Sequence, residues 1–95
     1  MSTPDELKIR PTKAFDRDLK RMQKRGKDPD RLRDVVERLR QRLGLEARHR
    51  DHALFGEWQG FRDCHVEPDW LLIYRVEEDQ LILARTGTHS DLFNK

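Results

Sequence analysis

The sequence predicts an α+β fold in which a two-helix hairpin packs on one face of a four- to five-stranded, mainly antiparallel sheet. Apolar residues recur at helical spacing within residues 12–44, and from residue 53 onward they follow the pattern of strands separated by short turns. The helices need a surface to cover and the sheet needs one covered face, which leaves its other face open to water. A length of 95 residues is typical of one core, so we predict a single domain spanning 1–95.

The first two elements are a short strand and a helix. Residues 7–10 alternate apolar and polar side chains and stop at Pro11, as an edge strand does. Thr12 is placed to cap the helix that follows, and Gly26 is placed to end it. The apolar stripe of this helix consists of Phe15, Leu19 and Met22.

A second helix is predicted to begin at Asp28 and Pro29. Aspartate is a preferred N-cap residue, and proline at the first helical position lacks only an N–H that would have no partner there. Apolar residues then keep helical spacing until Gly44, and they are Leu32, Val35, Val36, Leu39 and Leu43. We expect the two helices to form an antiparallel hairpin that is apolar inside and basic outside.

Three strands follow a polar stretch, residues 45–52, that we predict to be a loop. The strands cover residues 61–67, 70–76 and 80–86, and Gly87 breaks the last one. Because only tight turns separate them, they are predicted to form an antiparallel meander.

The alternation in the first of these strands predicts which side chains reach the open face. Cys64 and Val66 are small and apolar, so we expect them to face the helices. His65 then stands on the open face, flanked by Asp63 and Glu67. In the last strand the same rule places Leu81, Leu83 and Arg85 on one face, with Arg85 near the rim.

Three histidines could meet at one edge of the sheet with a carboxylate and a guanidinium, although a single surface histidine usually has no such role. Histidine gives or takes a proton near neutral pH. The carboxylate could orient an imidazole, and the guanidinium could stabilise a phosphate that gains charge. These five candidates are His52, His65, His89, Asp69 and Arg85. Their spacing matches no metal-ligand motif, so we expect no metal and no cofactor.

Other residues allow simpler interpretations. Trp58 and Trp70 could stack on RNA bases, but each could equally pack in the core or at its rim. Cys64 is most simply a buried apolar residue. We assign no role to His49, which lies in the predicted loop.

The composition narrows the class of protein. Residues 1–50 hold 16 Lys and Arg against 9 Asp and Glu, whereas residues 51–95 hold 4 against 9, so a basic half precedes an acidic one. A basic half rich in arginine suits nucleic acid, although salt-bridged helix surfaces would explain the same charge. A lone cysteine, the absence of an export signal and the lack of long apolar runs favour a cytoplasmic protein over a secreted or membrane protein.

Three segments carry a resemblance to a known family. They are Asp-His-Ala-Leu at 51–54, the stretch from Gly56 to Trp70 that contains His-Val-Glu-Pro-Asp-Trp, and residues 85–93, which begin Arg-Thr-Gly-Thr-His. The chain resembles YafQ-type toxins, a branch of the RelE/ParE superfamily of bacterial type II toxin–antitoxin systems. The resemblance runs from about Lys13 to Phe93.

The resemblance implies a RelE-like fold and an mRNA interferase that cleaves messenger RNA on the translating ribosome without a metal, silenced by a cognate antitoxin. Residues at the positions of the family's active site are His52, His65, Asp69 and His89. Arg85 matches the basic residue of the late strand, and Phe93 matches a C-terminal aromatic linked to activity. The chain departs from the family at Ala53, where proline is frequent, and at Phe61, where tyrosine is frequent.

Metal-free cleavage of RNA needs a base for the 2′-OH, an acid for the leaving 5′-oxygen and cations for the charged phosphorane. Imidazoles can supply the first two, and Arg85 and Arg62 are candidates for the third. Arg62, Trp58 and Trp70 are the predicted RNA contacts. Two alternatives remain: a non-enzymatic binding toxin, as in the gyrase-inhibiting branch, and an RNA-binding module without activity. The antitoxin could wrap the helices or block the open face.

Overall fold

One mixed sheet of five strands organises the protein in this computed structural model, which describes residues 5–94. The strand order is β1-β5-β4-β3-β2, and the bounds are Lys8–Pro11 for β1, His52–Ala53 for β2, Arg62–Glu67 for β3, Trp70–Glu77 for β4 and Gln80–Gly87 for β5. The predicted antiparallel meander is confirmed for β3, β4 and β5. β1 instead pairs parallel to β5. Parallel strands require a crossover connection, and the two long helices that follow β1 in the chain provide it.

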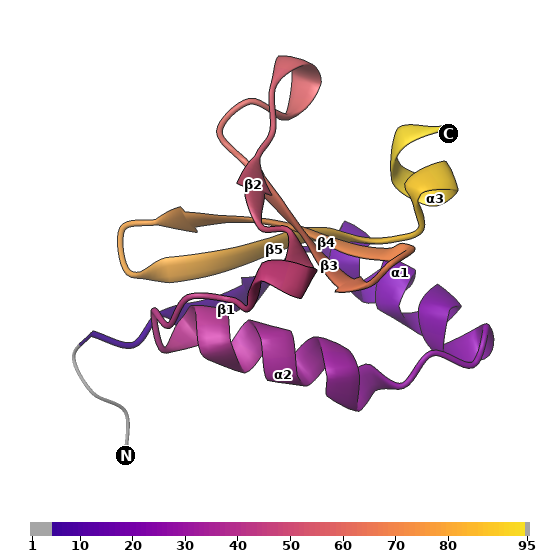
Figure 1. The fold of residues 1–95 in the computed structure, drawn as a ribbon, viewed down its shortest axis with the longest axis horizontal. Coiled ribbons are helices and arrows are strands. Elements are labelled where there is room, and N and C mark those ends of the chain that lie inside the picture. The colour runs from indigo at the N-terminus through magenta and orange to yellow at the C-terminus, as the bar shows by residue number, and fades with distance from the viewer. Residues whose placement is uncertain (1–4, 95) are drawn as a thin grey trace.

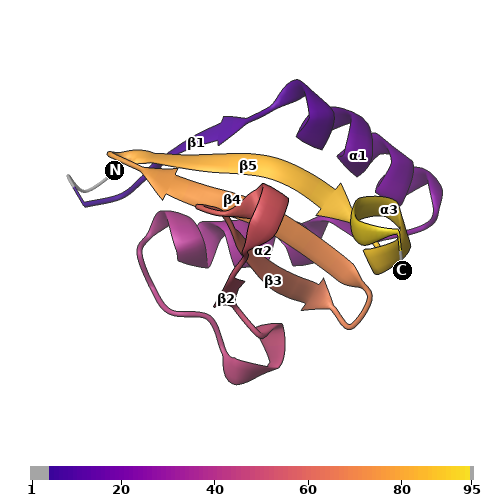
Figure 2. The same ribbon diagram turned by 90° about the horizontal axis from the view of Figure 1, so that it is seen from above.

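The helices occupy both sides of this sheet. Figure 1 shows α1 (Lys13–Lys24) and α2 (Pro29–Arg40) on one side, and the short α3 (His89–Phe93) on the other. Two 3-10 turns, η1 (Ala47–His49) and η2 (Gly56–Trp58), flank β2. In Figure 2, α3 lies at the same end of β5 as the C-terminal end of α1. Within residues 5–94, no helix has the length and apolar character needed to span a membrane.

The predicted helix caps are confirmed. The Thr12 hydroxyl accepts a hydrogen bond from the Phe15 N–H at 3.1 Å, and the Asp28 carboxylate accepts one from the Asp30 N–H at 2.9 Å. Gly26 follows the C-cap of α1 with φ +89°, a conformation that glycine adopts without steric cost.

The predicted end of the second helix is wrong by several residues. α2 ends at Arg40, and Arg42 takes the left-handed conformation with φ 61° that closes the helix. The Leu43 N–H then bonds back to the Arg38 carbonyl at 2.9 Å, so these backbone groups are satisfied without Gly44. Leu43 is 46% exposed and lies outside the core, because the chain has already left the helix.

The core lies between the two long helices and one face of the sheet. It gathers Leu7, Phe15, Met22, Leu32, Val35, Val36, Leu39, Cys64, Val66, Trp70, Leu72, Tyr74, Leu81 and Leu83. Trp70 is fully buried, and its indole N–H donates to the Thr86 hydroxyl at 2.9 Å. The predicted stacking of Trp70 on RNA bases is therefore wrong, since the helices cover its ring.

Two irregularities in strand register change the predicted alternation. Tyr74 pairs with Leu83 but Ile73 pairs with Arg85, so Ala84 is an extra residue that bulges from β5. Leu83 and Arg85 therefore lie on opposite faces, although simple alternation placed them together.

A second irregularity lies between His65 and Glu67 in β3. It turns Glu67 away from the open face, where alternation had placed it. The Glu67 carboxylate accepts a hydrogen bond from Lys27 Nζ at 2.8 Å and lies 3.5 Å from Arg31 Nε. Glu67 is therefore tied to the helical layer.

Candidate active site on the open face of the sheet

Cross-strand pairing assembles the candidate site in two rows on the face that α1 and α2 do not cover. One row runs His52, Asp63, Ile73, Arg85 across four strands. The other runs His65, Leu71, Gly87. Directly paired residues share a face, so the polar members of both rows lie above an apolar floor of Ile73 and Leu71, which are fully buried.

The imidazoles of His65 and His89 face each other above this floor. Their ring centroids lie 5.5 Å apart, and the rings are inclined at 73°. Partial burial lowers the pKa of His65, and the nearby positive groups of His89, Arg50 and His52 lower it further, against the opposing effect of the Pro68 carbonyl. His65 is therefore neutral at pH 7 and able to accept a proton.

Asp69 holds His89 in place. One oxygen, Oδ1, lies 2.6 Å from His89 Nδ1 and accepts the His89 backbone N–H at 2.9 Å. These bonds, the backbone one first, lower the pKa of Asp69, so it is ionised at neutral pH. An ionised acceptor fixes the proton on Nδ1 and leaves Nε2 free for a substrate. The position of His89 is fixed in turn by α3, whose Thr88 and Asp91 form a reciprocal cap.

His52 lies beside the buried carboxylate of Asp63, which strand alternation predicts only as a neighbour of His65. His52 Nδ1 lies 2.6 Å from the Arg50 carbonyl, and its Nε2 lies 3.7 Å from Asp63 Oδ2. Burial raises the pKa of Asp63 to about 6, although the charges of His52 and His89 oppose this effect. Among the described residues, Asp63 Oδ1 is the buried side-chain oxygen without a hydrogen-bond partner. An unsatisfied buried acceptor is costly, which marks Asp63 as a candidate functional residue.

Arg85 joins the site from β5, but its guanidinium is anchored beneath by α1. Nε and Nη2 donate to the two oxygens of Asp18 at 2.5 and 3.1 Å. These bonds raise the pKa of Arg85, which stays charged under all ordinary conditions. Its side chain remains 30% exposed.

The structure does not bring Arg62 and Trp58 to the histidines. Arg62 pairs with Tyr74, on the helix-facing side of the sheet, and donates from Nε to Asp51 at 3.1 Å. Trp58 packs its ring edge against Phe61, with centroids 5.3 Å apart. Phe93 lies half-buried at the end of α3, the helix that His89 begins.

His49, which no pattern in the sequence marks as functional, supports the site from the other side of β3. It is 8% exposed, and its Nδ1 lies 2.6 Å from the carbonyl oxygen of His65, to which an Nδ1–H can donate. Only the tertiary fold brings η1 against β3, so no local pattern identified this contact.

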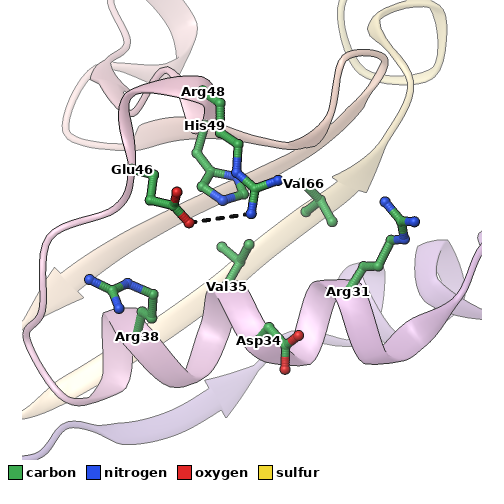
Figure 3. Close-up of a pocket in the computed structure, with 8 residues that line it drawn as sticks. All are labelled: Arg31, Asp34, Val35, Arg38, Glu46, Arg48, His49 and Val66. Carbon is green, nitrogen blue, oxygen red and sulfur yellow. Dashed lines mark hydrogen bonds and ion pairs between the residues drawn. The ribbon is translucent and has the colours of Figure 1, made fainter.

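A pocket of about 240 Å³ lies between α2 and the η1 segment, as Figure 3 shows. Its lining residues are Arg31, Asp34, Val35, Arg38, Glu46, Arg48, His49 and Val66. None of the site residues predicted from the sequence lines it. His65 lines a neighbouring pocket of about 270 Å³, but the other residues predicted from the sequence line neither pocket, so the candidate site is the open face. Within the described chain, no three His, Cys, Asp or Glu residues are arranged to hold a metal ion.

Comparisons with known proteins address the family and the fold. The chain is 46% identical over 80 residues to an mRNA interferase toxin YafQ of Escherichia coli K12, which covers 83% of this chain and 87% of that protein. The structure of the E. coli DinJ–YafQ toxin–antitoxin complex superposes with a TM-score of 0.85 at 43% identity, covering 93% of this chain and 98% of that one. The crystal structure of a metal-bound toxin from Helicobacter pylori superposes with a TM-score of 0.86 at 43% identity, covering 92% of this chain and 99% of that one.

A family model extends this similarity to nearly the whole chain. The model is described as a bacterial toxin of type II toxin–antitoxin system, YafQ, and it matches residues 7–94. The match confirms the resemblance carried by the three sequence segments and the RelE-like fold expected from it. The imidazole cluster lies inside the matched region. This chain belongs to the YafQ family of bacterial toxins from type II toxin–antitoxin systems.

Proposed function

We propose that this toxin is a single-domain mRNA interferase that cleaves messenger RNA on the ribosome by histidine-based acid–base catalysis, without a metal. The observation that carries the proposal is the pairing of His65 with His89, whose ring centroids lie 5.5 Å apart while Asp69 fixes His89. The name of the E. coli relative, an mRNA interferase toxin, supports the same reaction.

The lowered pKa of His65 and the contact between His89 and Asp69 suggest which imidazole acts as base and which as acid. His65, with its lowered pKa, is the candidate base and takes the proton of the ribose 2′-OH. The 2′-oxygen then attacks the phosphorus, and the 5′-oxygen leaves with a proton from His89. Asp69 holds that ring in position through its contact with Nδ1, as the carboxylate of a catalytic triad does for its histidine. The products are a 2′,3′-cyclic phosphate and a free 5′-hydroxyl.

The remaining site residues act on charge and position. Arg85 is placed to stabilise the negative charge that the phosphorane gains. His52 and Asp63 form a second imidazole–carboxylate pair beside His65, available to bind the ribose or to exchange its proton. Phe93, at the end of α3, offers a ring against which a base can stack.

An antitoxin is the proposed protein partner, and mRNA under translation is the proposed target. Because translation takes place in the cytoplasm, the toxin is proposed to act there. The E. coli relative was solved as a toxin–antitoxin complex with DinJ. An antitoxin segment that covers the open face would exclude RNA from the imidazoles.

The test is to map new RNA 5′ ends after induction of the wild type, His65→Ala and His89→Gln. We expect the wild type to produce new ends, and each variant to cleave about 10²- to 10⁴-fold more slowly while keeping its fold. A purified assay with one 2′-deoxy substitution at the cleaved position should stop cleavage, because the nucleophile is absent.

Variants that remain folded and fully toxic would contradict the imidazole mechanism, and so would cleavage of the 2′-deoxy substrate. A matched supercoiling assay addresses the gyrase-inhibiting alternative. A toxin that blocks supercoiling without generating new 5′ ends would replace the proposed function with that one.

A further inference from the structure

Helix α1 contributes a buried carboxylate to the underside of the candidate site. Asp18 is 2% exposed, although aspartate is rarely buried without partners. It accepts hydrogen bonds from Nε and Nη2 of Arg85 at 2.5 and 3.1 Å and from the Thr86 backbone N–H at 3.2 Å. Arg21 Nη1 lies 3.6 Å away on the exposed side of the helix.

These contacts use one edge of the Arg85 guanidinium and leave the other edge available. A guanidinium has five N–H donors in a planar fork. Asp18 accepts one hydrogen bond from Nε and one from Nη2, so both protons of Nη1 and the second proton of Nη2 remain available to a substrate. That free edge can bind two oxygens of one phosphate in the bidentate arrangement typical of arginine. The 30% exposure of the side chain lets a phosphate reach it.

We infer that Asp18 is a positioning residue of the reaction: it fixes Arg85 so that the free edge of the guanidinium points at the substrate phosphate. The inference rests on the proposed function, since it specifies how the phosphate of that reaction is held. Arg85 is the residue that acts on the phosphate, and Asp18 acts through it.

The bond to Thr86 supports a positioning role over a purely stabilising one. Arg85 and Thr86 are consecutive, and the bulge at Ala84 directly before them makes the strand irregular there. Asp18 fixes both the side chain of the first and the main chain of the second. Gly87 and Thr88 then lead directly to His89, so the same contact steadies the approach to the proposed acid.

The experiment compares Asp18→Asn with the control Asp16→Asn, which removes the same charge from an exposed position of α1. Asparagine keeps the shape and one acceptor oxygen, so the variant should fold. We expect Asp18→Asn to lower kcat about 10- to 100-fold with little change in KM, because misplacing a group by about 1 Å has effects of this size. The control should match the wild type.

A double-mutant cycle separates positioning from stability. If Asp18 acts through Arg85, then adding Asp18→Asn to Arg85→Ala should lower kcat by less than about twofold further. A loss that is equally large in both backgrounds would overturn the inference. An Asp18→Asn variant with the same kcat as the Asp16→Asn control would also overturn it.

A second readout does not need cleavage, and it distinguishes failure of this inference from failure of the proposed function. In ¹⁵N NMR spectra, inorganic phosphate should shift the Arg85 Nε–H signal of the wild type and the control, and about tenfold more phosphate should be needed in Asp18→Asn. If phosphate leaves this signal unchanged, or acts equally on all three proteins, the inference is wrong. A toxin that shows the phosphate effect but cleaves no RNA would keep Asp18 as the residue that positions Arg85 for a phosphate, and would lose the proposed function.

Discussion

Replacing Asp63 with asparagine should make the protein more stable at neutral pH. Asp63 is buried, one of its oxygens has no hydrogen-bond partner among the described residues, and its pKa is about 6 against an ordinary 3.8. At about 1.36 kcal/mol for each pKa unit, keeping this carboxylate ionised in the folded state costs about 3 kcal/mol at pH 7.5. Asp63→Asn removes the charge and keeps the shape, so its free energy of unfolding should rise by an amount of this order.

The gain should depend on pH in a defined direction. The folded state of the wild type binds the Asp63 proton more tightly than the unfolded chain does, because the folded pKa is the higher one. The contribution of Asp63 to the free energy of unfolding therefore falls as pH rises from about 4 through about 6. The difference between Asp63→Asn and wild type should be largest at pH 7.5 and nearly absent at pH 4.

Unfolding in guanidinium chloride at pH 7.5 and at pH 4 measures the difference in free energy of unfolding between Asp63→Asn and wild type at each pH. Asp16→Asn is the exposed control. We expect Asp63→Asn to cleave RNA more slowly than wild type despite its greater stability, because the carboxylate beside His52 is lost. A variant less stable than wild type at pH 7.5, or an equal difference at both pH values, would show that the buried charge of Asp63 does not destabilise the fold.

Three further predictions concern a thiol, an imidazole and an indole. Burial raises the pKa of the Cys64 thiol, so a disulfide reagent should label it only after denaturant is added; rapid labelling of the folded protein would contradict this. The rate of cleavage should rise with pH through a midpoint below 6.5, as His65 loses its proton, and a midpoint above 7 would exclude His65 as the base. Trp70→Phe should lower the free energy of unfolding by about 1–3 kcal/mol, since it removes the buried bond to Thr86, and unchanged thermal unfolding would contradict that estimate.

Local chemistry made several elements predictable. Thr12 and Asp28 cap helices because their side chains accept bonds from backbone N–H groups a few residues away, and such contacts need no distant partner. The spacing of apolar residues likewise predicts α1, α2 and the meander, since helical and strand periods are properties of the chain itself. The open-face position of His65 followed from the same alternation.

The structural predictions that were wrong concern places where segments distant in the sequence meet. The bulge at Ala84 depends on how β4 and β5 pair, so a pattern within residues 80–86 could not show it. The end of α2 depended on a left-handed Arg42, a conformation that sequence rules assign to glycine or asparagine. Trp70 could have stacked on RNA or packed inside, and the packing of the helices decided between these.

The fold class, the family and the residue types of the site could be predicted without coordinates, because periodicity, capping and the motifs around His52, His65 and His89 lie in contiguous segments. The contacts that give those residues their chemistry form only in the folded chain: Asp18 beneath Arg85, His49 behind His65, and the burial of Asp63. Protonation and orientation depend on burial and on neighbours within a few ångströms, and these exist only after remote parts of the chain have come together.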